Sequence, residues 1–154
     1  TTVDSRILEL FPDDEYKRLL VLTLADRLAE ATSEVLHLYV RRKMWGYMPD
    51  EQLTVAQLHR EEFQGIRPAV GYPSLPDQSV NFLLNELLDM KRIGITLTEH
   101  GAMSPQASVS GLMIAHPASH YFSVGKISHE QLADYAFRRG YTEEEMRKYL
   151  TTLL

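Results

Sequence analysis

The sequence predicts an α+β fold in which a long central helix and further helices pack on a small antiparallel sheet. Three observations support this class. Residues 13 to about 44 have apolar residues at helical spacing and no internal Gly or Pro. After Gly94 the apolar residues alternate with polar ones, which is typical of strands. From Ser128 onward, signals for helix starts return. The order of these segments predicts separate helical and sheet regions.

The long helix is predicted from its ends and its apolar spacing. Asp13 and Asp14 place negative charge at its N-terminus, and Gly46 and Pro49 prevent its continuation. Apolar residues recur at steps of three and four, which predicts a buried stripe covered on more than one side. The stripe comprises Leu20, Leu24, Leu28, Ala31, Val35 and Leu38, widened by Leu22, Ala25, Ala29 and Leu36.

Two shorter helices are predicted in the middle of the chain. Thr54 and Gln57 have the spacing of a capping box, so a helix is expected over residues 54–63. Asp77 or Ser79 is expected to cap a second helix that runs to residue 93 and stops at Gly94.

The sheet is expected to form from three segments. Residues 95–98, 107–115 and 120–127 are strand-like, and residues 117–119 are expected to form the turn between the last two. The long helix should then cross one face of this sheet. Two further capping boxes predict helices up to Gly140 and to about residue 154; these boxes are Ser128 with Gln131 and Thr142 with Glu145.

Composition restricts the kind of protein this can be. The length of 154 residues is typical of one domain, so residues 1–154 are treated as one. The absence of Cys excludes disulfides, cysteine zinc sites and thiol nucleophiles. The net charge of −5 argues against non-specific binding to nucleic acid. No apolar run could span a membrane and no signal sequence is visible, so a cytoplasmic location is expected.

The sequence contains no recognisable catalytic or metal-binding motif. The six His residues show no ligand spacing around a carboxylate, so no metal site is expected. Ser108 and Ser110 lack the elbow motif of hydrolases. The glycine spacing in residues 65–73 is not a phosphate loop, because no Lys-Ser/Thr pair follows it.

The least generic segment is the loop of residues 65–73. Arg67 and Tyr72 each precede a proline, which holds both in an extended backbone. Gly71 would permit close approach of another backbone or a ligand. Arg67 could bind a carboxylate or phosphate through two hydrogen bonds. The alternative interpretation is a structural connection in which Arg67 pairs with Glu61 or Glu62.

The spacing of Arg67, Gly71 and Tyr72 resembles the S-adenosylmethionine-binding signature of the activation domain of cobalamin-dependent methionine synthase. Further segments agree with this family in order and spacing, over most of the chain from about Asp13 to Leu154. These segments are residues 26–30, 45–47, 64–69, 97–99, 107–111, 116–117 and 134–136.

The resemblance implies a ligand site. Arg67 would bind the methionyl carboxylate, and the backbone through Ala69 would bind the adenine. Gly71 belongs to the same signature, and Tyr72 would lie near the sulfonium. Two carboxylates that the family places beside the site match Glu30 and Glu61. For Glu30 an ordinary ion pair remains the alternative, and Glu61 could instead belong to a charged helix face.

The family also has an aromatic pair near the site, which matches Tyr121 and Phe122. Neighbouring side chains of a strand point to opposite faces. One of the two is therefore expected to line the site and the other to lie in the core. Phe122 lacks the hydroxyl group of the tyrosine with which it is compared.

The resemblance further implies a function. The domain would bind S-adenosylmethionine and support reductive methylation of cob(II)alamin to methylcobalamin in methionine synthesis, as part of a methyltransferase. The isolated domain is not expected to be active alone, and no catalytic side chain is implied. Cobalamin would be bound by the cobalamin-binding domain of methionine synthase, and a flavodoxin-type reductase would supply the electron. The alternative is a module that docks on a cobalamin domain or a flavodoxin without binding S-adenosylmethionine.

The family's domain is longer than this chain, and its first part supplies an Asp for the ligand's amino group. No residue before Asp13 matches that part. The chain is therefore expected to be the C-terminal portion of the activation domain.

Overall fold

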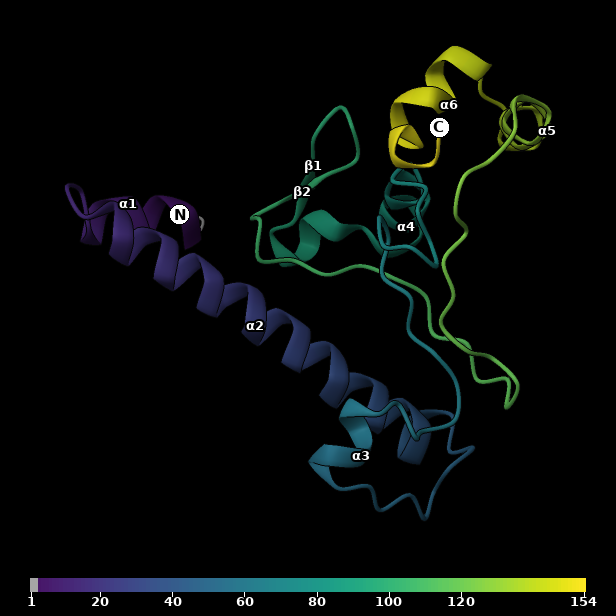
Figure 1. Cartoon of the computed structure of the whole chain (residues 1–154). Coiled ribbons are helices and arrows are strands. Elements are labelled where there is room, and N and C mark those ends of the chain that lie inside the picture. Colours follow the sequence, from purple (N-terminus) through teal and green to yellow (C-terminus); the bar gives the residue numbers. More distant parts are fainter. Residues whose placement is uncertain (1–2) are drawn as a thin grey trace.

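The computed structural model describes residues 3–154, which form mainly helices joined by long extended segments (Figure 1). In chain order the elements are α1 (Val3–Leu10), α2 (Glu15–Tyr39), the π-helical turn η1 (Val40–Met44), α3 (Val55–His59), α4 (Val80–Leu88), the 3₁₀ turn η2 (Met90–Ile93), β1 (Thr96–Leu97), β2 (Met103–Ser104), α5 (His129–Arg139), α6 (Glu143–Tyr149) and the 3₁₀ turn η3 (Thr151–Leu153). The α+β class, the long helix and the small antiparallel sheet are confirmed.

The long helix begins and ends where the sequence predicts. The Asp14 side chain accepts a hydrogen bond from the backbone N–H of Lys17 at 2.9 Å, which satisfies one of the free donors of the first turn. Helix α2 continues directly into η1. Gly46 then takes a φ of 66°, the left-handed conformation that terminates helices most easily at glycine.

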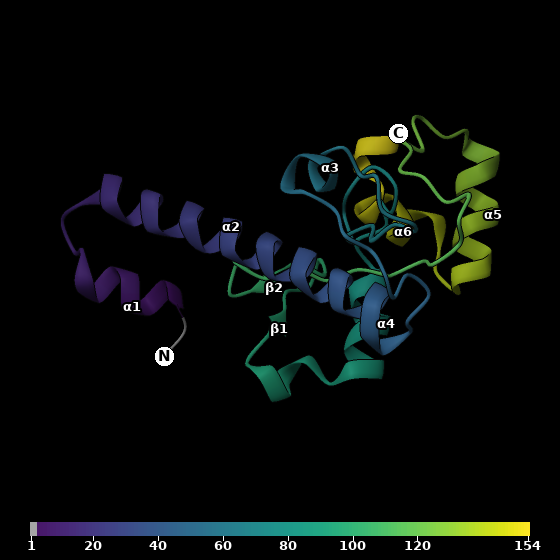
Figure 2. The same ribbon diagram turned by 90° about the horizontal axis from the view of Figure 1, so that it is seen from below.

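The expected burial of the apolar stripe on α2 is wrong. Leu24, Leu28 and Val35 are 54%, 69% and 66% exposed. Figure 2 shows that α2 extends away from the rest of the molecule, with α1 folded back along its first turns. Burial on α2 is confined to the last turn, at His37. Among the described residues, no helix is both long and apolar enough to cross a membrane.

Helix α1 was not predicted from the sequence. Its Ile7 is only 4% exposed. The turn after α1 is closed by a hydrogen bond from the Phe11 N–H to the Ile7 carbonyl at 3.0 Å. A helix of this length would be marginal in isolation, so its packing against α2 accounts for its formation.

The predicted three-segment sheet is wrong in detail. Only two-residue strands form: Thr96 pairs with Ser104 and Leu97 with Met103. Strands this short present no continuous apolar face, so α2 does not cross a sheet face as expected. The segment around Val109 pairs instead with residues 66–69 through two isolated bridges.

Residues 120–127 form no strand, although a turn does precede them as predicted. Their backbone groups bond elsewhere: the Val124 N–H donates to the Pro73 carbonyl at 3.2 Å and the Phe122 N–H to Ser74 Oγ at 3.0 Å. Ile127 N–H donates to the Leu153 carbonyl at 3.0 Å. Residues 120–127 therefore bond to residues 73–74 and 153, and not to residues 107–115 as the predicted hairpin required.

The predicted helix that stops at Gly94 is interrupted at Asp89, which has a φ of 50°, so that α4 and η2 are separate. Neither expected residue caps α4 through its side chain. Asp77 instead accepts hydrogen bonds from the Ser79 N–H at 2.8 Å and from Tyr135 Oη at 2.7 Å. Burial and this bond to Asp77 raise the pKa of Tyr135 to about 12. Asp77 thus ties α5 to the start of α4.

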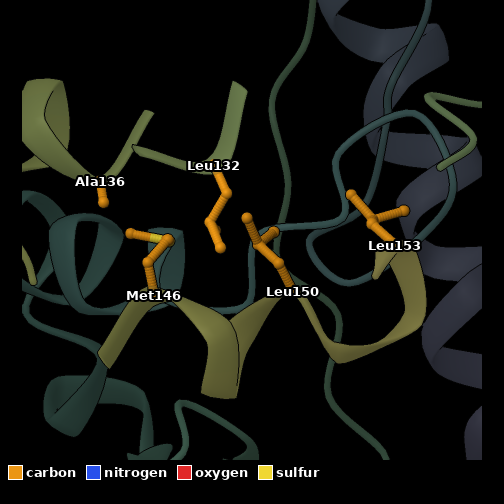
Figure 3. Close-up of a cluster of buried hydrophobic side chains, with 5 residues drawn as sticks. All are labelled: Leu132, Ala136, Met146, Leu150 and Leu153. Carbon is orange, nitrogen blue, oxygen red and sulfur yellow. The ribbon is translucent and has the colours of Figure 1, made fainter. Parts of the chain in front are cut away.

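All three predicted capping boxes form, at Thr54, Ser128 and Thr142. The last two open α5 and α6, which pack together at the end of the molecule far from α1 (Figure 1). Figure 3 shows Leu132 and Ala136 of α5 facing the side chains from α6 and the residues after it. This cluster comprises Leu132, Ala136, Met146, Leu150 and Leu153.

We predict that Leu132→Ala lowers the free energy of unfolding by about 2–5 kcal/mol, because Leu132 is fully buried and its removal leaves a cavity. Denaturant titration followed by circular dichroism measures this. Phe137→Ala on the same helix is the control, because Phe137 is 84% exposed and should change stability by less than about 0.5 kcal/mol. Equal losses for both variants would show that the α5–α6 packing is wrong.

Candidate functional site

The loop singled out by the sequence is held as an extended strip, residues 66–70, beside residues 110–114. The Ile66 N–H donates to the Ile114 carbonyl at 2.9 Å, and the Ile114 N–H returns the bond at 2.9 Å. The Leu112 N–H donates to the Pro68 carbonyl at 3.1 Å. The pairing uses the backbone groups of alternate strip residues, so those of Arg67 and Ala69 point the other way.

Gly111 makes this close pairing possible. A Cβ atom at position 111 would lie 2.4 Å from the Pro68 carbonyl oxygen and 3.1 Å from the Ala69 Cα. Any other residue at position 111 would push the strip away. Gly111 was not predicted from the sequence to be a site residue.

The free edge of the strip faces Tyr121. The Arg67 N–H donates to Tyr121 Oη at 2.9 Å, so these two residues lie in direct contact. Among the described residues, the Arg67 carbonyl and the Ala69 N–H have no hydrogen-bond partner. On the edge that faces Tyr121, the strip therefore presents one free acceptor, the Arg67 carbonyl, and one free donor, the Ala69 N–H.

A cleft of about 650 Å³ opens along this edge, and we call it the Arg67 cleft. Seven of the eight predicted site residues line it, from α2, from the end of α3, from the strip and from the Tyr121 segment. They are Glu30, Glu61, Arg67, Ala69, Tyr72, Tyr121 and Phe122. Ser33, Val109, Ser74 and Ser123 also contribute to its walls.

The eighth predicted residue, Gly71, lies outside the Arg67 cleft and lines a neighbouring one. Its φ is 88°, and a Cβ atom there would lie 2.5 Å from Gln78 Oε1. Gly71 therefore allows the chain to turn beside Gln78. The group that approaches Gly71 closely is the Gln78 side chain, where the sequence predicted another backbone or a ligand.

The two acidic residues are held differently. Glu30 projects from α2 and pairs with Arg27 at 2.6 Å, with both side chains largely exposed. This is the ordinary ion pair that was given as the alternative role for Glu30. Glu30 nevertheless also lines the Arg67 cleft. Glu61 follows α3 with a φ of 57°, a conformation that is uncommon for residues other than glycine.

Both aromatic residues of the predicted pair line the cleft. Tyr121 is half-buried, whereas Phe122 is 54% exposed, as Tyr72 is at 58%. The expectation that one of the pair belongs to the core is wrong, because this segment is not a strand and its side chains do not alternate between two faces.

The guanidinium of Arg67 pairs with residues that the sequence did not suggest. Its Nη2 donates to Glu34 Oε2, and its Nη1 donates to His37 Nδ1 at 3.3 Å. The expected alternative partners, Glu61 and Glu62, are not used; Glu62 pairs with Arg60 at 2.6 Å. Arg67 therefore lines the cleft, while Glu34 and His37 of α2 bind its guanidinium group.

The comparisons agree with this architecture. The family model "Vitamin B12 dependent methionine synthase, activation domain" matches residues 6–140. The chain belongs to this family. It is similar to a crystal structure of the MetH reactivation domain bound to AdoHcy, with a TM-score of 0.91 and 44% sequence identity. That match covers 98% of this chain and 47% of the solved chain, so this activation-domain chain spans about half of its relative's length.

A largely buried polar cluster around the ring of Phe63, comprising Glu34, His37, Arg41 and Glu51, supports Arg67. Arg41 is fully buried and binds both oxygens of Glu51, each at 2.7 Å. Phe63 lies under both guanidinium groups, with the Cζ of Arg41 4.4 Å and that of Arg67 5.3 Å from the ring centroid.

Three members of this cluster, which lie on α2 and η1, were not predicted from the sequence. Glu34, His37 and Arg41 are spaced by three and four residues, so they share one helix face. That face lies about a quarter of a turn around the helix from the apolar stripe, so the apolar pattern did not indicate that it would be buried. Their shared spacing is visible in the sequence, but their contacts with Arg67 and their burial depend on distant residues. Among the described residues, no group of three or more acidic or His side chains could hold a metal ion.

His37 is uncharged at neutral pH. Its side chain is fully buried, and this burial, with the positive charges of Arg41 and Arg67, lowers its pKa from 6.5 to about 4. Neutral His37 can accept from Arg67 at Nδ1, which leaves Nε2 protonated, 3.5 Å from Tyr47 Oη.

The low pKa of His37 predicts acid sensitivity. The unfolded chain binds a proton at a pKa of 6.5 and the folded chain only at about 4, so stability is complete above pH 6.5 and falls as the pH drops toward 4. The loss from this group should reach about 3 kcal/mol. We predict that His37→Asn removes this slope from unfolding curves between pH 7 and pH 4. The control His100→Asn, at an exposed position, should keep it; an unchanged slope in His37→Asn would contradict the assignment.

Proposed function

We propose that this chain binds S-adenosylmethionine in the Arg67 cleft and thereby supports reductive methylation of cob(II)alamin to methylcobalamin in methionine synthesis. One observation carries the proposal: a guanidinium, a free backbone donor and acceptor, and two carboxylates line the same cleft. These are the groups required by the ligand's carboxylate, adenine and sulfonium. The related MetH reactivation domain bound to AdoHcy, S-adenosylhomocysteine, supports the same assignment.

The adenine would lie along the strip. The edge of adenine that carries N1 and the 6-amino group offers one acceptor beside one donor. The Ala69 N–H and the Arg67 carbonyl provide the complementary pair, and among the described residues neither has another partner. Tyr72 and Phe122 expose enough of their rings to cover a flat base.

The remainder of the ligand would extend between opposite charges. Arg67 uses two of its five N–H groups for Glu34 and His37, so others can bind the ligand carboxylate. Glu30 and Glu61 line the same cleft and would lie near the positive sulfur. In this arrangement the chain orients the methyl group, and none of its side chains has to transfer a proton.

The remaining chemistry would come from partners. Cobalamin, carried by the cobalamin-binding domain of methionine synthase, supplies the metal that accepts the methyl group, and a flavodoxin-type reductase supplies the electron. The contribution of this chain is to bind and aim S-adenosylmethionine. The isolated chain is therefore expected to bind the ligand without turnover.

We predict that Arg67→Ala weakens binding of S-adenosylhomocysteine by about 1.5–3 kcal/mol, because the ligand carboxylate loses a charge-assisted partner. Isothermal titration calorimetry measures this. Arg60→Ala is the matched control, because Arg60 is exposed and does not line the cleft. If neither S-adenosylmethionine nor S-adenosylhomocysteine gave heat with the unmodified chain at millimolar concentration, the alternative of a docking module would be favoured. Unchanged affinity in folded Arg67→Ala would refute the role of Arg67.

We also predict that Glu61→Gln separates the two ligands. Only S-adenosylmethionine carries a positive sulfur, so its affinity should fall about fivefold while that of S-adenosylhomocysteine changes less than about twofold. Competition binding of both ligands to one preparation measures the ratio. Glu62→Gln is the control, since Glu62 pairs with Arg60 and does not line the cleft. Equal losses for both ligands would place the sulfur away from Glu61.

A further inference from the structure

We infer that Glu34 is the positioning residue for Arg67: it fixes the guanidinium in the orientation that receives the ligand's carboxylate. This inference rests on the proposed function. Glu34 lies one helical turn after Glu30 on α2, but only Glu30 lines the Arg67 cleft. Glu34 therefore acts on the ligand only through Arg67.

The contacts define one orientation of Arg67. Glu34 Oε2 accepts from Nη2, and His37 Nδ1 accepts from Nη1, so two rigid points on α2 hold the planar group. Phe63 lies 5.3 Å from the guanidinium carbon and supports its flat face. The Arg67 and Glu34 side chains are only 25% and 26% exposed, so water competes weakly for this pair.

The charges of the cluster show why Glu34 in particular is needed. Arg41 and Arg67 are both close to Phe63, and both carboxylate oxygens of Glu51 already accept hydrogen bonds from Arg41. His37 carries no charge at neutral pH. Glu34 is thus the remaining negative group that compensates Arg67 within the cluster. Without it, two guanidinium groups would repel each other across one ring, and Arg67 would turn toward solvent.

A competing role is possible for any carboxylate on a ligand-binding arginine, since it could occupy the ligand's place. The geometry disfavours this role. Glu34 is not among the residues that line the cleft, and three N–H groups of Arg67 remain beyond its bonds to Glu34 and His37. The ligand carboxylate and Glu34 would therefore bind different N–H groups of one guanidinium.

The test compares two ligands that differ in the group that Arg67 binds. S-adenosylhomocysteine has the amino-acid carboxylate, whereas 5′-methylthioadenosine has the same adenosine and sulfur without it. We expect Glu34→Ala to weaken S-adenosylhomocysteine about tenfold and 5′-methylthioadenosine less than about twofold. Glu34→Gln, which keeps an oxygen for Nη2 but loses the negative charge, should recover only part of the lost affinity. Glu15→Ala, at an exposed position on the same helix, should change neither ligand.

A double-mutant cycle completes the test. In an Arg67→Ala background, Glu34→Ala should have no further effect on S-adenosylhomocysteine, because its target is gone. Tighter binding by Glu34→Ala would show competition, and equal weakening of both ligands would show a general effect on the cleft; either result overturns the inference. If Glu34→Ala does not fold, Glu34→Gln and Glu34→Asp are compared with both ligands in the same way. Wild-type binding that depends on Arg67 but not on Glu34 would sink this inference alone, whereas absence of wild-type binding would sink the proposed function.

Discussion

The pairing of residues 66–70 with residues 110–114 is the interaction on which the rest of the site depends. Neither segment belongs to a regular strand, yet four backbone hydrogen bonds of 2.9–3.1 Å join them. Pro68 has no N–H, so it bonds only through its carbonyl, and Gly111 leaves the space for that contact. Because extended backbone alternates, fixing Ile66 and Pro68 on one edge directs Arg67 and Ala69 to the other, where the cleft lies.

The second support is the buried junction between α2 and η1, which carry His37 and Arg41. Burying His37 and Arg41 completely is unfavourable unless their polar groups are paired. Glu51 pairs Nε and Nη2 of Arg41, while the buried Nη1 has no hydrogen-bond partner among the described residues. An apolar cluster of similar volume could be as stable. A charged cluster, however, can extend to Arg67 through Glu34 and His37. The same helix thus provides a carboxylate to the cleft at Glu30 and a support behind the cleft at Glu34.

The sequence predicted features that depend on neighbouring residues. The three capping boxes, the end of the long helical segment (α2 and η1) before Gly46 and the turn before residue 120 all formed, because each is decided within a few residues. Features that depend on distant partners were missed. Residues 107–115 were correctly identified as extended but were assigned the wrong partner, since alternation defines a strand without naming its neighbour. Burial of the α2 stripe was inferred from periodicity, which identifies a face but not what covers it.

The same distinction explains the site. Arg67, Tyr121 and the carboxylates were identified by residue type and by resemblance, and the structure gathers them, although their binding roles remain proposals. Glu34 was missed because its contact spans 33 positions of sequence and nothing local marks it. The resulting cleft has a cation at Arg67 and anions at Glu30 and Glu61. A ligand with a carboxylate at one end and a positive sulfur further along would satisfy both charges in only one orientation, so these charges would act together with the adenine contacts of the strip to direct the ligand's methyl group.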